Sequence, residues 1–215
     1  MATKKTKVSR RKFIRTGAVV AGAGAATLAM PNVSMAATKT LKMQSSWGAT
    51  SPFQDMAKEY VTRVEAMAGG RLKIDLLPAG AVVGAFQVMD GVSDGVIDIA
   101  HSVAAYWYGK NKAASLFGTG PVFGGDPTNM LSWFYQGGGQ DLYRELTQDS
   151  MGLNVIGMFG FPMPAQPFGW FKNPINGVDD IKGIKYRTVG LAADLLQSMG
   201  MSVAQLPGGE IVPAM

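Results

Sequence analysis

The first elements of an α/β sheet are readable in residues 40–77, TLKMQSSWGATSPFQDMAKEYVTRVEAMAGGRLKIDLL. Partial alternation of apolar and polar residues predicts a strand over 40–46. A second strand is predicted over 71–77, where charged residues separate Leu72, Ile74 and Leu76. The two strands flank a helical pattern, which is the order that builds parallel sheets.

The helix between these strands has clear start and stop signals. Ser51 stands at the N-cap position, Pro52 at the first helical position and Gln54 at the third, and Gly69-Gly70 follows the last turn. One face of the helix is apolar and is formed by Phe53, Met56, Ala57, Tyr60, Val61, Val64 and Met67. The pattern predicts an amphipathic helix packed on the sheet.

A short helix over about 85–94 and a compact buried strand over 96–100 continue the alternation. Right-handed crossovers then give a largely parallel, open α/β sheet. Such sheets bind ligands beyond the carboxyl ends of their strands. We therefore expect a first α/β lobe over residues 38–161.

A second α/β lobe is expected to start at residue 162. Two strand-like runs, 154–161 and 166–172, are separated by Pro162-Met163-Pro164, which we interpret as the crossing between lobes. A strand ending at Arg187, a helix over 190–199 and a strand over 202–206 follow. Too few residues remain to complete this lobe, so we expect the 215 residues to be a fragment of a longer protein.

The composition excludes several classes of protein. With 47% hydrophobic and 16% charged residues, the chain is too apolar for a disordered protein. It has no cysteine and one histidine, which argues against disulfide-stapled, zinc and iron–sulfur proteins.

Residues 1–37 resemble an export signal. They hold seven of the 20 basic residues and no acidic one, so the net charge of +5 comes from this segment and a nucleic-acid surface is not indicated. A basic stretch is followed by an apolar run, Gly17 to Met30, and small residues around Ala36. Ser9-Arg10-Arg11-Lys12-Phe13-Ile14 resembles the twin-arginine motif, which favours export into a bacterial periplasm over a membrane anchor.

Arg187 is the most informative candidate for a binding residue. It ends a predicted strand and directly precedes Thr188-Val189-Gly190, where the 190–199 helix starts. Unpaired N–H groups at a helix start and the planar guanidinium together suit a carboxylate. The alternative is a surface arginine at the end of a strand.

Gln166 and four aromatic residues are further candidates. Gln166 offers a carbonyl oxygen to a hard cation or a polar ligand, although a structural role is the alternative. Trp47, Tyr106, Trp107 and Tyr108 follow predicted strands of the first lobe, where they would form either the walls of a pocket or part of the core.

Four other features are better explained without catalysis. Gly91-Val92-Ser93-Asp94-Gly95 has the spelling of a nucleophile elbow, but a helix precedes it and a strand follows, the reverse of the required order. His101 is interpreted as a satisfied histidine at a strand end. Asp179-Asp180 is interpreted as a turn or cap, and Gly118 to Pro121 is unsuited to phosphate because proline lacks an N–H.

The order of four motifs resembles the periplasmic solute-binding subunit of tripartite ATP-independent periplasmic (TRAP) transporters, in particular members that bind 2-oxo acids. The motifs are Gly95 to Ala100, Gln166 to Phe171, Asp179 to Arg187 and Pro207 to Ile211. The resemblance implies two α/β lobes, joined by hinge segments, that close over an organic acid. It also implies that Arg187 holds the substrate carboxylate and that Tyr106 belongs to the aromatic wall.

The resemblance further implies a sodium or calcium ion that bridges to the substrate. Gln166 would be one ligand, and the others, a Glu-Trp pair, would lie downstream of Met215. The small and large TRAP membrane subunits would be the partners, and a homodimer is possible in the full-length protein.

We therefore expect a non-enzymatic, exported protein that binds a small 2-oxo or 2-hydroxy monocarboxylate such as pyruvate or lactate, with Arg187, Gln166, Tyr106 and Trp47 as binding residues. The alternative is an exported hydrolase or redox enzyme whose catalytic residues lie beyond residue 215.

Overall fold

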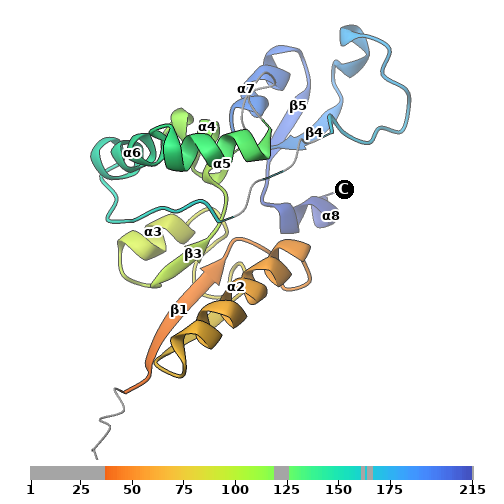
Figure 1. Cartoon of the computed structure of the whole chain (residues 1–215). Helices are drawn as coiled ribbons and strands as arrows, with labels where there is room; N and C mark the ends of the chain where they lie inside the picture. Colours follow the sequence, from red (N-terminus) through yellow and green to blue (C-terminus); the bar gives the residue numbers. More distant parts are fainter. Residues whose placement is uncertain (1–36, 119–125, 161–162, 164–166, 215) are drawn as a thin grey trace, which may run out of the picture. The chain divides into compact units, whose positions relative to one another are not determined.

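A parallel three-stranded sheet forms the first part of the structure (Figure 1). The computed structural model describes residues 37–118, 126–160, 163 and 167–214. The strands lie in the order β2-β1-β3, with bounds β1 Lys39–Ser45, β2 Leu72–Leu77 and β3 Ile99–His101. Both pairings are parallel, which confirms the predicted open α/β sheet.

Helix α2 (Pro52–Ala68) begins and ends where the sequence predicts. The Ser51 hydroxyl accepts a backbone N–H of the first turn at 3.3 Å, and Gly69 ends the helix with a φ of 56°, a left-handed conformation that favours glycine. The expected cap contribution of Gln54 is not seen. Its side chain is buried instead and accepts a hydrogen bond from the Ser45 hydroxyl.

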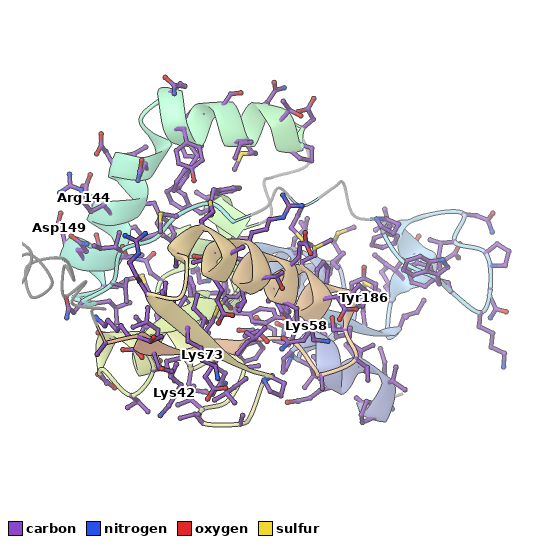
Figure 2. The ribbon with its side chains drawn as sticks, turned by 60° about the horizontal axis from the view of Figure 1, so that its bottom comes forward. Lys42, Lys58, Lys73, Arg144, Asp149 and Tyr186 are labelled. Atoms are coloured by element: carbon purple, nitrogen blue, oxygen red, sulfur yellow. The ribbon has the colours of Figure 1, made fainter. Side chains whose placement is uncertain are left out.

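The sheet packs on one face of α2. Met43 of β1, Ala57 of α2 and Ile74 of β2 form a buried cluster, and the alternate residues Lys42 and Lys73 are exposed (Figure 2). This is the period-2 pattern of a half-covered strand, which in β1 ends at Gln44, because Gln44 lies on the same face as Lys42 and is fully buried.

Part of the apolar face of α2 is exposed. Met56, Tyr60 and Met67 are exposed, whereas Ala57 packs on the sheet. The predicted amphipathic helix therefore packs on the sheet along part of its apolar face.

The third strand starts later than predicted. Helix α3 spans Val88–Ser93, and a turn follows in which the Gly91 carbonyl accepts N–H groups from both Val96 and Ile97. These bonds hold 95–97 in a turn, so that β3 pairs with β1 only from Ile99, and Val96 is exposed. The predicted strand over 96–100 is corrected accordingly.

Helical segments fill the stretch between β3 and the second sheet. Two of them are α5 and α6, and a π-helical turn continues α6. The bounds of these segments are Ala104–Trp107 and Lys112–Ala114 (both 3-10), α4 Ser115–Gly118, α5 Pro127–Gln136, α6 Gly139–Arg144 and the π-helical turn Glu145–Ser150.

The predicted strands over 154–161 and 166–172 are not seen in their described residues, 154–160 and 167–172. Burial still alternates along 153–160, as in a strand. A strand requires a partner backbone, and no described segment pairs with either run.

A second, two-stranded parallel sheet follows, with a helix between its strands. The elements are a 3-10 turn Val178–Ile181, β4 Lys185–Thr188, α7 Leu191–Ser198, β5 Ser202–Gln205, a 3-10 turn Gly208–Glu210 and α8 Ile211–Ala214. Ile181, Leu196 and Met201 form its core. The predicted strand–helix–strand order is confirmed.

Residues from Thr38 onward form one compact unit. The two sheets lie on either side of the predicted lobe boundary at 161/162, which stays a prediction, as does the leader over 1–37. Within the described residues, no helix combines the length and apolar character needed to cross a membrane.

Candidate functional site

A cavity of about 880 Å³ brings together residues that are far apart in the sequence. Trp47 follows β1, Tyr106 follows β3, and Arg187 lies in β4, and all three line this cavity. The cavity therefore lies at the carboxyl ends of strands from both sheets, which is the expected place for a ligand in α/β structures.

Arg187 is half-buried and is held by the backbone of its own lobe. Its Nε donates to the Leu206 carbonyl at 2.7 Å, and its Nη2 donates to the same oxygen. Among the described residues these are its two hydrogen bonds, so three of the five guanidinium donors remain. The Nη1–Nη2 edge is thus available for a carboxylate.

Arg187 also determines the charge of the cavity. Among the described residues that line it, Arg187 is the one charged side chain. The other lining groups are apolar, aromatic, hydroxyl or glycine residues. A single cation in such surroundings favours an anion with one negative charge.

The amino end of α7 forms part of the same wall. Leu191 and Ala192 line the cavity, a few residues after Arg187 in the chain. Because the cap residue Gly190 has no side chain to accept the first N–H groups of the helix, these groups add a partial positive charge to the wall.

Trp47 and its neighbours form an aromatic wall. The Trp47 ring lies 5.0 Å from the Phe53 ring and 5.9 Å from the Tyr106 ring, measured between centroids. Trp47 and Tyr106 are also members of the buried core. The two alternatives left open by the sequence, pocket wall and core, both hold for these residues.

His101 orients the Trp47 indole. Trp47 Nε1 donates to His101 Nδ1 at 2.7 Å, which requires that Nδ1 carries no proton. Burial lowers the pKa of His101 below its ordinary value of 6.5. The histidine is therefore a neutral structural acceptor, in line with the sequence interpretation.

This pKa shift predicts that the protein loses stability in mild acid. Because the folded state disfavours the proton, the unfolded state binds more protons as the pH falls below 6.5. The free energy of unfolding is constant above that value and falls below it, by at most about 1.4 kcal/mol per pH unit for one proton. Urea unfolding between about pH 5 and 7.5 measures this.

The matched control is His101→Gln, because the chain has one histidine. We expect the variant to lose the slope near neutral pH. A wild-type slope that persists in the variant would assign the effect to other groups.

Three further contacts join residues that follow β3 of the first sheet to residues in α7 and after β5 of the second sheet. The Tyr106 hydroxyl accepts the Gly208 N–H at 3.0 Å, Lys112 pairs with Asp194 at 2.6 Å, and the Tyr108 hydroxyl donates to Asp194. The hydrogen bond from Lys112 lowers the pKa of Asp194, and the same bond raises the pKa of Lys112. Since the Asp194 and Lys112 side chains are exposed, this pair orients α7 more than it stabilises it.

Other sequence candidates lie elsewhere. Gln166 is outside the described residues, although Met163 nearby lines the cavity. Trp107 and Tyr108 line a second, smaller cavity. Asp180 accepts the N–H groups of Asn176 and Gly177 at 2.8 and 3.2 Å, as expected of a cap.

Several lining residues were missed by sequence reasoning. The helical spacing of Leu191 and Leu195 predicts an apolar stripe along α7, but both are exposed and form cavity wall. Thr188 and Ile211 gave no signal of their own. Thr188 directly follows Arg187, and Ile211 comes two residues after the Gly208-Gly209 turn. These positions are the signal that could have indicated them.

The described residues show no metal cluster. No group of three or more His, Cys, Asp or Glu side chains within them could hold an ion, and the described cavity lining has no carboxylate. Its side-chain oxygen atoms are the hydroxyl groups of Thr50, Ser51, Tyr106 and Thr188. These residues by themselves do not fit a calcium site.

The family of bacterial extracellular solute-binding proteins, family 7 (DctP), matches residues 43–215. The chain belongs to this family. The resemblance identified from the sequence motifs is thereby confirmed.

Three relatives show what DctP proteins of this kind bind. The monocarboxylate 2-oxoacid-binding periplasmic protein of Nostoc sp. is 32% identical over 97% of this chain and 57% of its own length. A TRAP periplasmic solute-binding protein of Colwellia psychrerythraea, with calcium and pyruvate, has a TM-score of 0.74 and 33% identity over 82% of this chain and 53% of its own. The corresponding protein of Pseudoalteromonas atlantica, with sodium and pyruvate, has a TM-score of 0.68 and 32% identity over the same shares.

The chain spans little more than half the length of these DctP relatives. The predicted fold class, a two-lobed periplasmic-binding-protein architecture whose second lobe is incomplete in this chain, agrees with that coverage. The DctP family is described as extracellular solute-binding proteins, which agrees with a binding role.

Proposed function

We propose that this chain is part of an exported receptor that captures a small monocarboxylate, a 2-oxo or 2-hydroxy acid such as pyruvate or lactate, and performs no catalysis. Arg187 is proposed to hold the carboxylate, and Trp47 and Tyr106 to limit its size. The single observation that supports this most strongly is the charge of the cavity, in which Arg187 is the one charged residue of the described lining.

The geometry of Arg187 supports recognition of a carboxylate. The Leu206 carbonyl occupies one edge of the guanidinium and leaves the other edge for two parallel hydrogen bonds. A second carboxylate on the ligand would have no partner among the described lining residues, and burying it would be unfavourable. The cavity therefore favours monocarboxylates over dicarboxylates.

We also propose that a sodium or calcium ion binds beside the carboxylate, as in the two pyruvate-bound relatives. Gln166 is the proposed ligand from this chain, with further ligands downstream of Met215. Such an ion would attract the oxygen next to the carboxylate and thereby select 2-oxo and 2-hydroxy acids.

Calorimetric titration tests the proposal. Pyruvate and lactate are expected to bind with one site per chain, more tightly with sodium or calcium than without, and a dicarboxylate is expected to bind more weakly. A tighter dicarboxylate would contradict the proposed site. Steady conversion of pyruvate or lactate to a product would instead support the alternative of an exported enzyme.

The whole receptor is proposed to deliver its ligand to the small and large TRAP membrane subunits, and to form a homodimer. Residues 1–37 are proposed as a twin-arginine signal that exports it to the periplasm. A fusion of these residues to a reporter is expected to reach the periplasm only in cells with a working twin-arginine translocase. Export in cells without it would contradict this route.

A further inference from the structure

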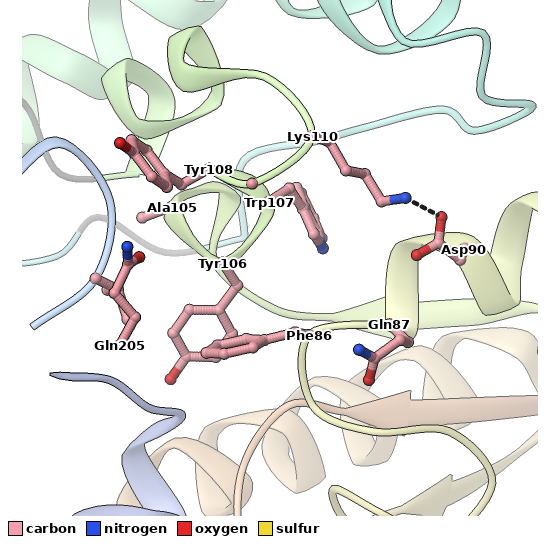
Figure 3. A pocket seen from close by; sticks show the side chains of 11 residues that line it. Phe86, Gln87, Asp90, Ala105, Tyr106, Trp107, Tyr108, Lys110 and Gln205 are labelled. Carbon is pink, nitrogen blue, oxygen red and sulfur yellow. Dashed lines mark ion pairs between the residues drawn. The ribbon is translucent and has the colours of Figure 1, made fainter. Parts of the chain in front are cut away.

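A second cavity, of about 370 Å³, differs from the carboxylate cavity in its charge. Its volume is near the lower end of the range for small-ligand sites, about 300–1,000 Å³. Arg187 does not line it. Its charged groups are Asp90 of α3 and Lys110, which form an ion pair at 2.7 Å, so the described lining is neutral overall (Figure 3).

An unpaired donor lies in the wall of this cavity. Trp107 is 8% exposed, and its Nε1 is buried without an acceptor among the described residues. Figure 3 shows the indole nitrogen pointing toward the space between Lys110 and Gln87. Buried indole N–H groups nearly always have a partner, so this one indicates an acceptor that binds there.

The remaining walls combine aromatic faces with side-chain amides. The Phe86 and Tyr106 rings meet edge to face with centroids 4.8 Å apart, and Gln87 and Gln205 contribute amide groups (Figure 3). Apolar walls with a few polar groups that converge are typical of sites for small molecules.

We propose that this cavity binds a small zwitterion of the amino-acid class. The carboxylate accepts from Trp107 Nε1 and Lys110, the ammonium donates to Asp90, and the rest of the molecule lies against Phe86. A simple carboxylate is disfavoured, because Asp90 already neutralises Lys110. The site does not involve Arg187, although Ala105, Tyr106 and Val189 line both cavities.

The indole signals of ¹⁵N-labelled full chain provide a direct test. The chain has four tryptophans, Trp47, Trp107, Trp133 and Trp170, and Trp107→Phe identifies the signal of interest. Titration with L-alanine is expected to shift the Trp107 N–H downfield and to saturate at a concentration of about 1–10 mM. The Trp47 N–H, already bonded to His101, is expected to stay in place.

Acetate and ethylamine, which each carry one of the two charges, are expected to bind about tenfold more weakly or less. Lys110→Gln and Asp90→Asn, both at partly exposed positions, are expected to weaken alanine binding about tenfold. Arg187→Met is expected to leave alanine binding unchanged, which separates this site from the carboxylate cavity.

Two results would overturn the proposal. One is a Trp107 signal that does not move with alanine, which would leave only water or the protein itself as the indole's partner. The other is an equal response to acetate, which would show that the ion pair does not select a zwitterion.

Discussion

Replacing Arg187 by methionine is expected to weaken pyruvate binding about 100-fold or more. Hydrogen bonds to a charged group contribute about 1.5–3 kcal/mol each, and the free edge of the guanidinium offers two. Methionine keeps much of the side-chain length but offers neither donor nor charge. Calorimetry of wild type and variant under one set of salt conditions measures the loss.

Two companion variants identify the cause of that loss. Arg187→Lys keeps the charge but removes the planar fork, and we expect it to bind about tenfold more weakly than wild type. Arg144→Met is the control, because Arg144 is an exposed arginine whose ion pair with Asp141 is long, at 3.7 Å. It is expected to leave pyruvate binding unchanged.

Stability must be measured alongside binding, because Arg187 also holds the Leu206 carbonyl. We expect the unfolding transition of Arg187→Met to shift much less than its binding constant. Unchanged pyruvate binding by a folded Arg187→Met protein would show that the carboxylate binds elsewhere.

Replacing Gly190 by alanine is expected to destabilise the protein by about 2–4 kcal/mol, from backbone strain together with steric overlap. Gly190 has φ 73° and ψ −154°, a region that residues with a Cβ rarely adopt. A Cβ there would lie 2.7 Å from the Ser115 hydroxyl oxygen. Because Gly190 connects β4 to α7, any shift that relieves this overlap moves the helix beside Arg187.

Variants of two other glycines separate the contribution of backbone strain from that of steric overlap. Gly183→Ala has a comparable φ of 74° but open space around the new Cβ, so it reports strain alone. Gly177→Ala has open space and an extended backbone, so it is expected to cost little. Urea unfolding of the three variants should rank Gly190→Ala as the least stable.

A second substitution tests the contact with Ser115. Ser115→Gly removes the two nearest atoms that the new Cβ would meet, at 2.7 and 3.2 Å, and leaves the ordinary contact with Ala105 Cβ at 3.5 Å. Combined with Gly190→Ala, it should restore part of the lost stability relative to the sum of the single variants. Simple additivity would mean that only the backbone conformation requires glycine at position 190.

The structure confirms the predictions that depended on local signals. Ser51 and Gly69 bound α2, and alternation identified β2, because caps and side-chain periodicity act within a few residues. Asp180 was interpreted as a cap for the same reason, and it is one.

Predictions that depended on a distant partner were less successful. The run at 154–160 has the burial pattern of a strand but no described neighbour to pair with. Leu195 has the spacing of a core residue and forms cavity wall instead, since periodicity specifies a face of the helix but not what covers it.

The features of the candidate site also divide into those that depend on neighbouring residues and those that depend on tertiary packing. The sequence alone determined that Arg187 lies near the end of a strand that leads into a helix, and its motifs carried the family resemblance, because both are properties of neighbouring residues. Only the tertiary structure decided that Trp47, Tyr106 and Arg187 line one cavity, that Leu206 occupies one edge of the guanidinium, and that the Trp107 indole has no acceptor among the described residues. Trp47, Tyr106 and Arg187 are each more than 50 residues apart, and even Arg187 and Leu206 are 19 apart, so the packing of the chain, not local propensity, determines these contacts.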